Sequence, residues 1–448
     1  MTAFLFALAR VAGVLLAAFA AGWAIARALL PRGAAFRLER AGWAFAVGIS
    51  LLAAFVPLSA WVGARPGWMQ FIVLAGVGLV VSYTFRVSSV ELGEDFGQPE
   101  PRDRRPATLV LGVLIFLGIA LYALRALTEP MWSNDFVAIW GLKGKAIALS
   151  GGIPGWMRES PGFAHPEYPL GLPFLYAGIA FLTGGWDDHA MALLFPLLQV
   201  ATVGVALGWL RRRGVPPAAA LLAAAILANF EPLYSAFLTG LAEVPLAFGA
   251  LLFGTALADA LDPAETGALR RLALAAAILA ATKNEGLFLA AVACAIGLAL
   301  GGRRRWRIAA AALPTALLVH LLHRLWRGRL PLRDFDLGLF SLERLRESLA
   351  TAAAVLGPSG GIGLALALAL GLLGARRRDA LAPVALAVCA AAAYLLLPAF
   401  AVRGPEWMVH TTLARIGAAL APLAAAGIGL GFARRAPLGA APVHPANP

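Results

Sequence analysis

The sequence predicts an all-α protein that crosses a membrane many times. Of its 448 residues, 60% are apolar and only 14% are charged, and the mean hydropathy is +0.79. Soluble domains average roughly 45–50% apolar and about 25% charged residues, so most of this chain is expected to face lipid. The apolar stretches are continuous and do not alternate with polar residues, which excludes a transmembrane β-barrel.

The apolar stretches predict about thirteen transmembrane helices, because a run of about 20 apolar residues crosses the hydrocarbon core of a bilayer. We expect these helices at residues 11–30, 41–63, 69–85, 107–127, 188–210, 216–230, 233–258, 272–282, 287–301, 308–323, 347–374, 380–400 and 415–433.

The basic residues predict the orientation of these helices. A net charge of +13 would suggest nucleic-acid binding in a soluble protein, but here the arginines form short clusters between apolar runs, such as Arg211–Arg213 and Arg303–Arg305. Alternating loops place more than half of all Lys and Arg residues on one side, which the positive-inside rule assigns to the cytoplasm. We therefore expect no nucleic-acid partner, an outer N-terminus and a cytoplasmic C-terminus.

Two segments depart from a simple series of spans. Residues 128–187 form a long outer segment whose apolar stretch at 170–182 is too short to cross and is expected to lie along or dip into the outer leaflet. The apolar run at 272–281 is also short and ends in the polar stretch 282–286. Polar backbone at membrane depth needs cover from protein or a water-filled cavity, so we expect a cavity open to the outside.

The lysines point to the same side. Lys143, Lys145 and Lys283 are the only lysines, and all three map to the outer side. Chance placement is the alternative, since three residues are a small sample; the functional interpretation is that a compact ammonium meets a phosphate or carboxylate as a point charge. On a helix, Lys145 points roughly 200° away from Lys143.

Six short motifs then occur in an order that resembles GT-C glycosyltransferases, the polyprenyl-phosphate-sugar-dependent membrane enzymes that include protein mannosyltransferases and aminoarabinose transferases. The resemblance covers about residues 107–433. Its landmarks are Trp132-Ser133-Asn134-Asp135-Phe136, Trp140-Gly141-Leu142-Lys143, His165-Pro166-Glu167-Tyr168-Pro169-Leu170-Gly171, Leu241-Ala242-Glu243-Val244-Pro245, Thr282-Lys283-Asn284-Glu285-Gly286, and His410 with Arg415.

The resemblance implies a catalytic role for Asp135, which matches the acidic residue of the first outer loop in that superfamily. Transfer from a lipid phosphate needs a carboxylate to take the acceptor's hydroxyl proton and cations to stabilise the departing phosphate. Lys143, Lys283 and Arg415 are the candidate cations. The alternative for Asp135 is an N-cap of the helical stretch 136–149.

Further residues are candidates for substrate binding, each with a structural alternative. Several family members carry a lysine beside the acidic residue before the proline, whereas this chain has Glu167-Tyr168-Pro169. The lysine–phosphate contact of those members therefore has no counterpart at this place. Glu167 is a candidate for binding the sugar or the acceptor, and the alternative is that Tyr168 is an interfacial aromatic and Pro169 opens a short helix.

Glu243 lies at the outer end of a predicted span, where an unpaired carboxylate is a functional candidate by default; its alternative is a partner for an outer arginine. Lys283 and Glu285 are expected to pair with other groups rather than with each other, or to be structural. His410 and Arg415 occupy the last outer turn and the start of the final span, where Arg415 either binds the lipid phosphate or snorkels to the headgroups.

Some members of the superfamily that this chain resembles hold a divalent metal with acidic residues of the outer loop. Here no Asp-x-Asp occurs at the expected place and the histidines lack metal-ligand spacing, so we expect no metal and no cofactor. The basic stretch 324–346 is expected outside, where it either attracts anionic lipid carriers or forms an amphipathic surface helix.

The sequence thus predicts three parts: a three-span extension with its cytoplasmic loop at 1–106, a GT-C-like catalytic core at 107–433 with the outer loop at 128–187, and a cytoplasmic tail at 434–448. The expected function is transfer of a sugar from a polyprenyl-phosphate donor to a lipid, glycan or protein acceptor on the periplasmic face of a bacterial inner membrane. The alternative is a transporter or flippase of a lipid-linked sugar, which is expected to show internal repeats that we do not find. A member that only binds lipid is the third possibility.

Overall fold

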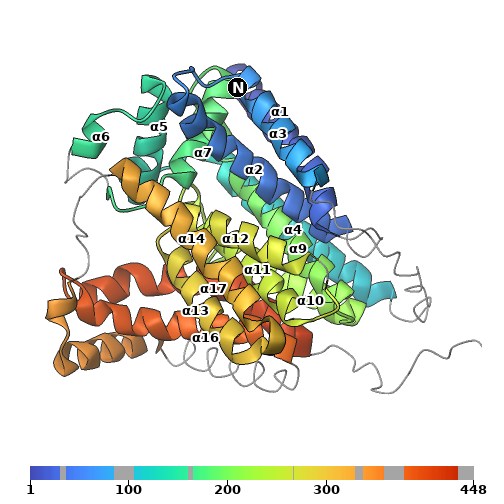
Figure 1. Cartoon of the computed structure of the whole chain (residues 1–448), viewed down its shortest axis with the longest axis vertical. Coiled ribbons are helices and arrows are strands. Elements are labelled where there is room, and N and C mark those ends of the chain that lie inside the picture. Colours follow the sequence, from blue (N-terminus) through green and yellow to red (C-terminus); the bar gives the residue numbers. More distant parts are fainter. Residues whose placement is uncertain are drawn as a thin grey trace, which may run out of the picture.

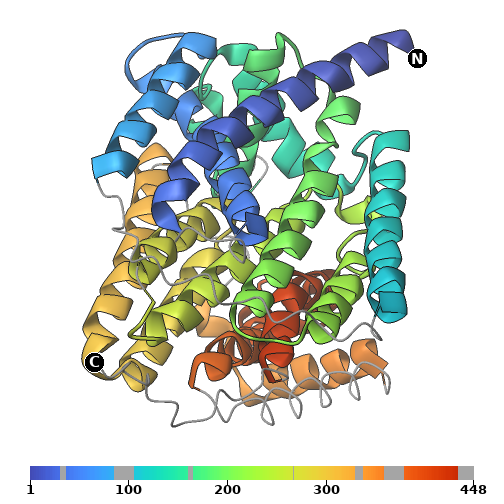
Figure 2. The ribbon, with the colours of Figure 1, turned by 90° about the vertical axis from the view of Figure 1, so that its right-hand side faces the viewer.

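The computed structural model describes residues 1–30, 37–84, 105–159, 165–265, 267–327, 336–357 and 378–431. Within these ranges every regular element is a helix, so the all-α class is confirmed. Helices of many lengths pack around one long buried helix, and Figures 1 and 2 show them from two directions.

The N-terminal helices pack closely against the rest of the chain. They are α1 (Thr2–Leu29), α2 (Arg37–Trp61), α3 (Trp68–Thr84) and α4 (Arg105–Thr128). Helix α2 contacts α1, and it also contacts α7 and α9 from later in the sequence. Helix α1 begins nine residues earlier than predicted and includes Arg10, the charge that interrupts its apolar run, which donates a hydrogen bond of 2.8 Å to the carbonyl of Thr183.

The segment between α4 and α9 is built from short helices at one end of the molecule, next to α1–α3 in Figure 1. They are the π-helix η3 (Phe136–Trp140), α5 (Gly141–Ser150), α6 (Trp156–Glu159), α7 (Gly171–Thr183) and α8 (Asp188–Met191). The apolar stretch at 170–182, which we expected to lie along or dip into the outer leaflet, forms the short helix α7, and this helix is buried against α2 and α5.

Helix α11 (Glu243–Leu261) forms the buried centre of the molecule. It follows α9 (Leu194–Arg212), α10 (Pro217–Ala228) and the 3-10 helix η4 (Ala236–Leu238). Its neighbours are α9, α12, α16 and α17, and nearly all of its residues are buried. The prediction of a span at 233–258 is wrong in its start, because residues 229–242 form turns and the short η4, with Gly240 at φ +96°.

The C-terminal half completes the bundle. It contains α12 (Ala268–Thr282), α13 (Glu285–Leu300), η5 (Gly302–Arg304), α14 (Arg305–Arg327), η6 (Leu337–Leu339), a helix over 342–357, α16 (Arg378–Leu396), η7 (Leu397–Phe400) and α17 (Pro405–Gly431). The predicted break after residue 281 is confirmed between α12 and α13. The second half of the span predicted at 347–374 lies outside the described residues.

The predicted number of spans is wrong. In the described part of the chain, seven helices are long and apolar enough to cross a membrane, or up to eight if the bent helix α17 counts as one span. Length accounts for part of the difference, because α3, α10 and α13 form where expected but are apolar helices of only 10–17 residues over their described parts. In its described part the chain is therefore an all-α membrane protein with fewer full spans than its apolar stretches predict.

Candidate active site

Five of the residues singled out in the sequence meet in one ion-pair network, which we call the Glu243 network. The Arg415 guanidinium binds Asp135 at 2.7 Å and Glu243 at 2.6 Å. The Lys283 ammonium binds the same Glu243 oxygen, Oε1, at 3.2 Å and also binds Glu285 at 2.8 Å. The expectation that Lys283 and Glu285 would not pair with each other is therefore wrong.

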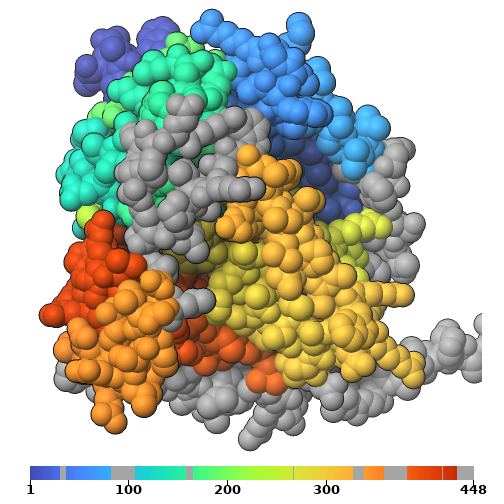
Figure 3. Space-filling model, turned by 60° about the vertical axis from the view of Figure 1, so that its left-hand side comes forward, coloured from blue at the N-terminus to red at the C-terminus, as the bar shows by residue number. Residues whose placement is uncertain are grey.

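These side chains come from four segments that are far apart in the sequence. Asp135 precedes η3, Glu243 begins α11, Lys283 and Glu285 flank the junction of α12 and α13, and Arg415 lies within α17. Figure 3 shows the green surface of the α5–α7 region directly beside the red surface of the C-terminal helices, in agreement with the contact between Asp135 and Arg415.

Two glycines allow these segments to approach one another. At the junction of α12 and α13, Lys283 is extended (φ −158°, ψ 156°), and a Cβ on Gly286 would lie 2.2 Å from the carbonyl oxygen of Leu279. A Cβ on Gly240, which already has φ +96°, would lie 2.8 Å from the ring of Phe136. Only glycine fits both places without a shift of backbone or ring.

Burial increases across the network from Asp135 to Glu243. The side-chain exposed fractions are 34% for Asp135, 22% for Arg415, 17% for Glu285, 8% for Lys283 and 0% for Glu243. Asp135 is therefore the most exposed carboxylate of the network, and Glu243, which contacts both cations, is the most buried.

The side chain of Asp135 does not cap a helix. It occupies the residue before η3 but has helical φ and ψ and makes no side-chain capping hydrogen bond. It forms an ion pair with Arg415 instead, so the geometry favours a role within the charged network over the capping alternative.

Lys143, Glu167 and Tyr168 form a second group beside this network. Lys143 donates a 2.6 Å hydrogen bond to the carbonyl of His165, whose Nδ1 lies 2.8 Å from Glu167 Oε1. The Tyr168 ring stacks between Trp140 and His165, with centroids 5.4 and 5.0 Å away, and lies within electrostatic range of Lys283. The second group therefore adjoins the Glu243 network.

The charge of Lys143 is poised near neutral pH. Burial lowers the pKa of its ammonium to about 7, and the nearby charge of Glu167 opposes this shift. Lys145 is exposed, as its helical spacing predicts. The two lysines of α5 thus differ sharply in environment.

His410 is not brought into the network. It is exposed on the first part of α17 and precedes Arg415 by five residues, which places the two side chains roughly 140° apart around the helix. Among the described residues, no group of three or more His, Cys, Asp and Glu side chains is arranged to hold a metal ion.

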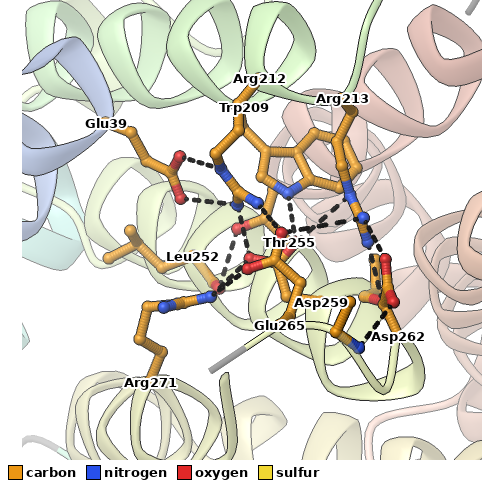
Figure 4. Close-up of polar contacts among 12 residues, drawn as sticks. Glu39, Trp209, Arg212, Arg213, Leu252, Thr255, Asp259, Asp262, Glu265 and Arg271 are labelled. Atoms are coloured by element: carbon orange, nitrogen blue, oxygen red, sulfur yellow. Dashed lines mark hydrogen bonds and ion pairs between the residues drawn. The ribbon is translucent and has the colours of Figure 1, made fainter. Parts of the chain in front are cut away.

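A second charged cluster, which the sequence did not reveal, lies at the other end of α11. This Asp259 cluster, drawn in Figure 4, comprises Glu39, Arg212, Arg213, Asp259, Asp262, Glu265 and Arg271. Arg212 binds Glu39 at 2.8 Å, Asp259 at 2.5 Å and Glu265 at 2.5 Å. Burial raises the pKa of Glu265, and the neighbouring charge of Asp259 raises it further.

The Asp259 cluster joins the ends of five helices. Arg271 at the start of α12 binds Asp259 of α11 at 2.9 Å and donates to the carbonyl of Leu29 at the end of α1. Arg212 belongs to α9, and its ion pair with Glu39 connects α2 to the cluster. The arginines that the sequence placed on one side of the membrane, from the 211–213 and 270–271 groups, do lie together here.

Comparisons of the chain with known protein families, with curated proteins and with solved structures each give no match. A function is therefore proposed from the geometry of the site together with the motifs.

Three side chains near the site were not among the candidates singled out from the sequence. Trp140 and His165 complete the aromatic stack around Tyr168, and Asn284 lies directly before α13, next to Lys283. All three belong to the motifs that carry the GT-C resemblance, so their position beside charged candidates was the available signal. The carboxylate Asp259 within an otherwise apolar span was the signal for the second cluster.

Proposed function

We propose that the chain is a membrane glycosyltransferase of the GT-C type, which transfers a sugar from a polyprenyl-phosphate donor to an acceptor hydroxyl on the periplasmic face of a bacterial inner membrane. The observation that carries the proposal is the convergence of Asp135, Glu243, Lys283 and Arg415 from four distant segments. Asp135 contacts Arg415 directly, and Glu243 joins Arg415 to Lys283, so the network supplies the base and the phosphate-binding charges that this reaction requires.

In the proposed reaction, Asp135 accepts the proton of the acceptor hydroxyl as its oxygen bonds to the anomeric carbon of the sugar. The bond from this carbon to the phosphate oxygen breaks, and its electron pair stays on the departing polyprenyl phosphate. Arg415 and Lys283 stabilise the negative charge on that phosphate, and the Lys143 ammonium adds to the positive potential.

Arg415 is paired with Asp135, so the proposed base and one of the proposed phosphate-binding cations bind each other. The network also holds three carboxylates against two cations, which leaves no unpaired cation within it for a phosphate. We therefore infer that the donor phosphate replaces Asp135 on Arg415, which frees this carboxylate to accept a proton.

A transporter or flippase is the rival function. Alternating access would require the Asp259 end of α11 to open, and that end carries a buried cluster of ion pairs between five helices. Breaking buried ion pairs is costly, so this arrangement favours a protein whose substrates enter from the Glu243 end alone.

The experiment that tests the proposal is sugar transfer in membranes from a strain that overproduces the protein, given a panel of radiolabelled lipid-linked sugars. We expect label to move from one donor into an acceptor fraction, above the level in membranes from the parent strain. Equal labelling in both membranes for every donor would contradict the proposal.

A further inference from the structure

Three buried acceptor oxygens near the Glu243 network lack a donor. They are Oε2 of Glu243, Oε2 of Glu167 and Oδ1 of Asn284, and none has a hydrogen-bond partner among the residues that the structure describes. The side chains of Glu243 and Glu167 are only 0% and 3% exposed. Because buried polar atoms are nearly always paired in proteins, these three acceptors call for donors from water or from a ligand.

In Glu243 and in Glu167, one carboxylate oxygen is paired and the other has no partner among the described residues. Oε1 of Glu243 accepts from Lys283 at 3.2 Å and from Arg415 Nε at 3.0 Å. Oε1 of Glu167 is paired with His165 Nδ1 at 2.8 Å. The cations and His165 therefore fix each carboxylate while its second oxygen stays available.

The chemistry of these oxygens selects the part of the substrate that they meet. An ionised carboxylate and an amide oxygen only accept hydrogen bonds, so their partner must supply O–H or N–H donors. A phosphodiester has none, whereas a sugar ring carries several hydroxyls. The cations of the network thus match the phosphate, and the unpaired oxygens match the sugar.

The position of Glu243 indicates which sugar hydroxyl it meets, given the proposed function on which the inference rests. Its Oε1 holds the two cations proposed to bind the phosphate, and that phosphate is bonded to C1 of the sugar. The hydroxyl nearest to this linkage is the one on C2. We propose that Glu243 is a specificity-determining residue, whose Oε2 accepts a hydrogen bond from the C2 hydroxyl of the donor sugar, while Asn284 and Glu167 accept from hydroxyls farther around the ring. Bonds to this hydroxyl also strengthen in glycosyl-transfer transition states of glycoside hydrolases.

The test measures dissociation constants of the purified full-length protein in detergent for farnesyl phosphate glycosides of mannose, glucose, galactose and arabinose. Each is compared with its 2-deoxy-2-fluoro counterpart, in which fluorine keeps the size of the hydroxyl but cannot donate. For the glycoside that binds, we expect the hydroxyl form to bind about 10- to 100-fold more tightly, the effect of a hydrogen bond to a charged group.

Two variants separate a direct contact from a general loss of charge. In Glu243→Gln, the carbonyl oxygen is expected to face Lys283 and Arg415, which leaves the amide NH₂ at the Oε2 position, so the preference should fall to about 1. Glu285→Gln removes a carboxylate from the same lysine without touching a buried unpaired oxygen, so it should keep the preference of the wild type.

Equal binding of the hydroxyl and fluoro forms to the wild-type protein would overturn the inference, and that comparison needs no variant. An equal loss of preference in Glu285→Gln and Glu243→Gln would overturn it as well. If the protein binds none of the glycosides, the proposed function itself fails; if it binds one without preference at C2, only this inference fails.

Discussion

At the scale of single residues, Asp135 is the side chain on which the proposed chemistry depends. It is the most exposed member of the Glu243 network and is bound to Arg415. Asp135→Asn keeps the size of the side chain but cannot accept the proton, so sugar transfer should fall by about 10²- to 10⁴-fold. Initial rates measured in membranes, normalised to the amount of protein, check this expectation.

Glu129→Gln is the matched control for Asp135→Asn. Glu129 is an exposed carboxylate of the same segment and accepts a 3.1 Å hydrogen bond from the Trp132 indole. We expect this variant to transfer sugar at nearly the wild-type rate. Activity of Asp135→Asn within a few-fold of wild type would reject Asp135 as the base and shift the assignment to Glu167 or Glu243.

The lowered pKa of Lys143 predicts how the stability of the protein depends on pH. Folding lowers its pKa from 10.5 to about 7, so between these values the unfolded chain binds more protons than the folded protein. Stability should therefore rise with pH across this window, by about 2 kcal/mol between pH 7 and pH 9. Unfolding in detergent should show this slope in the wild type and in Lys145→Met, but not in Lys143→Met. The same slope in Lys143→Met would assign it to another group.

At the scale of elements, the contact between α7 and α12 positions the group of Lys143, Glu167 and Tyr168 against the Glu243 network. Gly171 begins α7, and a Cβ there would lie 2.3 Å from the carbonyl oxygen of Ala281 at the end of α12. Gly171→Val should therefore push the two helices apart, destabilise the protein by about 1–3 kcal/mol and weaken donor use.

Gly185→Val is the control for that substitution, because a Cβ at Gly185 meets no atom within 4 Å. Thermal unfolding and transfer rates of both variants should separate them clearly. Equal stability and activity in Gly171→Val and Gly185→Val would mean that the α7–α12 contact does not shape the site.

The Asp259 cluster gives a second prediction at this scale. Arg212→Met would leave Asp259 and Glu39 without a main partner, and removing one member of a buried ion pair costs about 3–5 kcal/mol. Arg211 is exposed and donates only to the carbonyl of Val215 among its described contacts, so Arg211→Met should change stability by less than about 0.5 kcal/mol. Unfolding in mixed detergent micelles measures both; equal effects would show that the cluster adds no stability.

The positions of most helices could be predicted because long apolar runs and polar breaks are local signals. Helix α7 and the break before Lys283 are examples. The start of α11 could not be predicted, since apolar residues continue from 233 into the helix, while distant contacts such as the 2.8 Å hydrogen bond from the Tyr176 hydroxyl to the carbonyl of Gly240 help to hold this segment outside the helix. Tertiary contacts of this kind leave no mark in a local pattern.

At the scale of the whole molecule, α11 connects two charged networks. Its 19 residues span about 28 Å, close to the thickness of a bilayer core, with Glu243 at one end and Asp259 near the other. Motif order predicted the members of the Glu243 network, whereas their partners depend on which helices meet. The membership of the Asp259 cluster could not be predicted, because charge clusters next to spans indicate sidedness and not pairing.

The central claim is that the Glu243 network faces the outside of the cell, and the measurement that tests it most directly is the labelling of single cysteines. Gly152 follows α5 at the end of the molecule that carries this network, and its Cβ position is nearly open. Arg304 donates to the carbonyl of Asp262 within the Asp259 cluster. Cys294 and Cys389 are first replaced by alanine, and Gly152→Cys or Arg304→Cys is then introduced into separate proteins.

Spheroplasts carrying each protein are exposed to a membrane-impermeant maleimide before and after permeabilisation. The account predicts that the cysteine at position 152 is labelled in intact spheroplasts and that the cysteine at position 304 is labelled only after permeabilisation. Labelling of position 304 in intact spheroplasts, with position 152 protected, would place Asp135 and its partners in the cytoplasm and contradict the account.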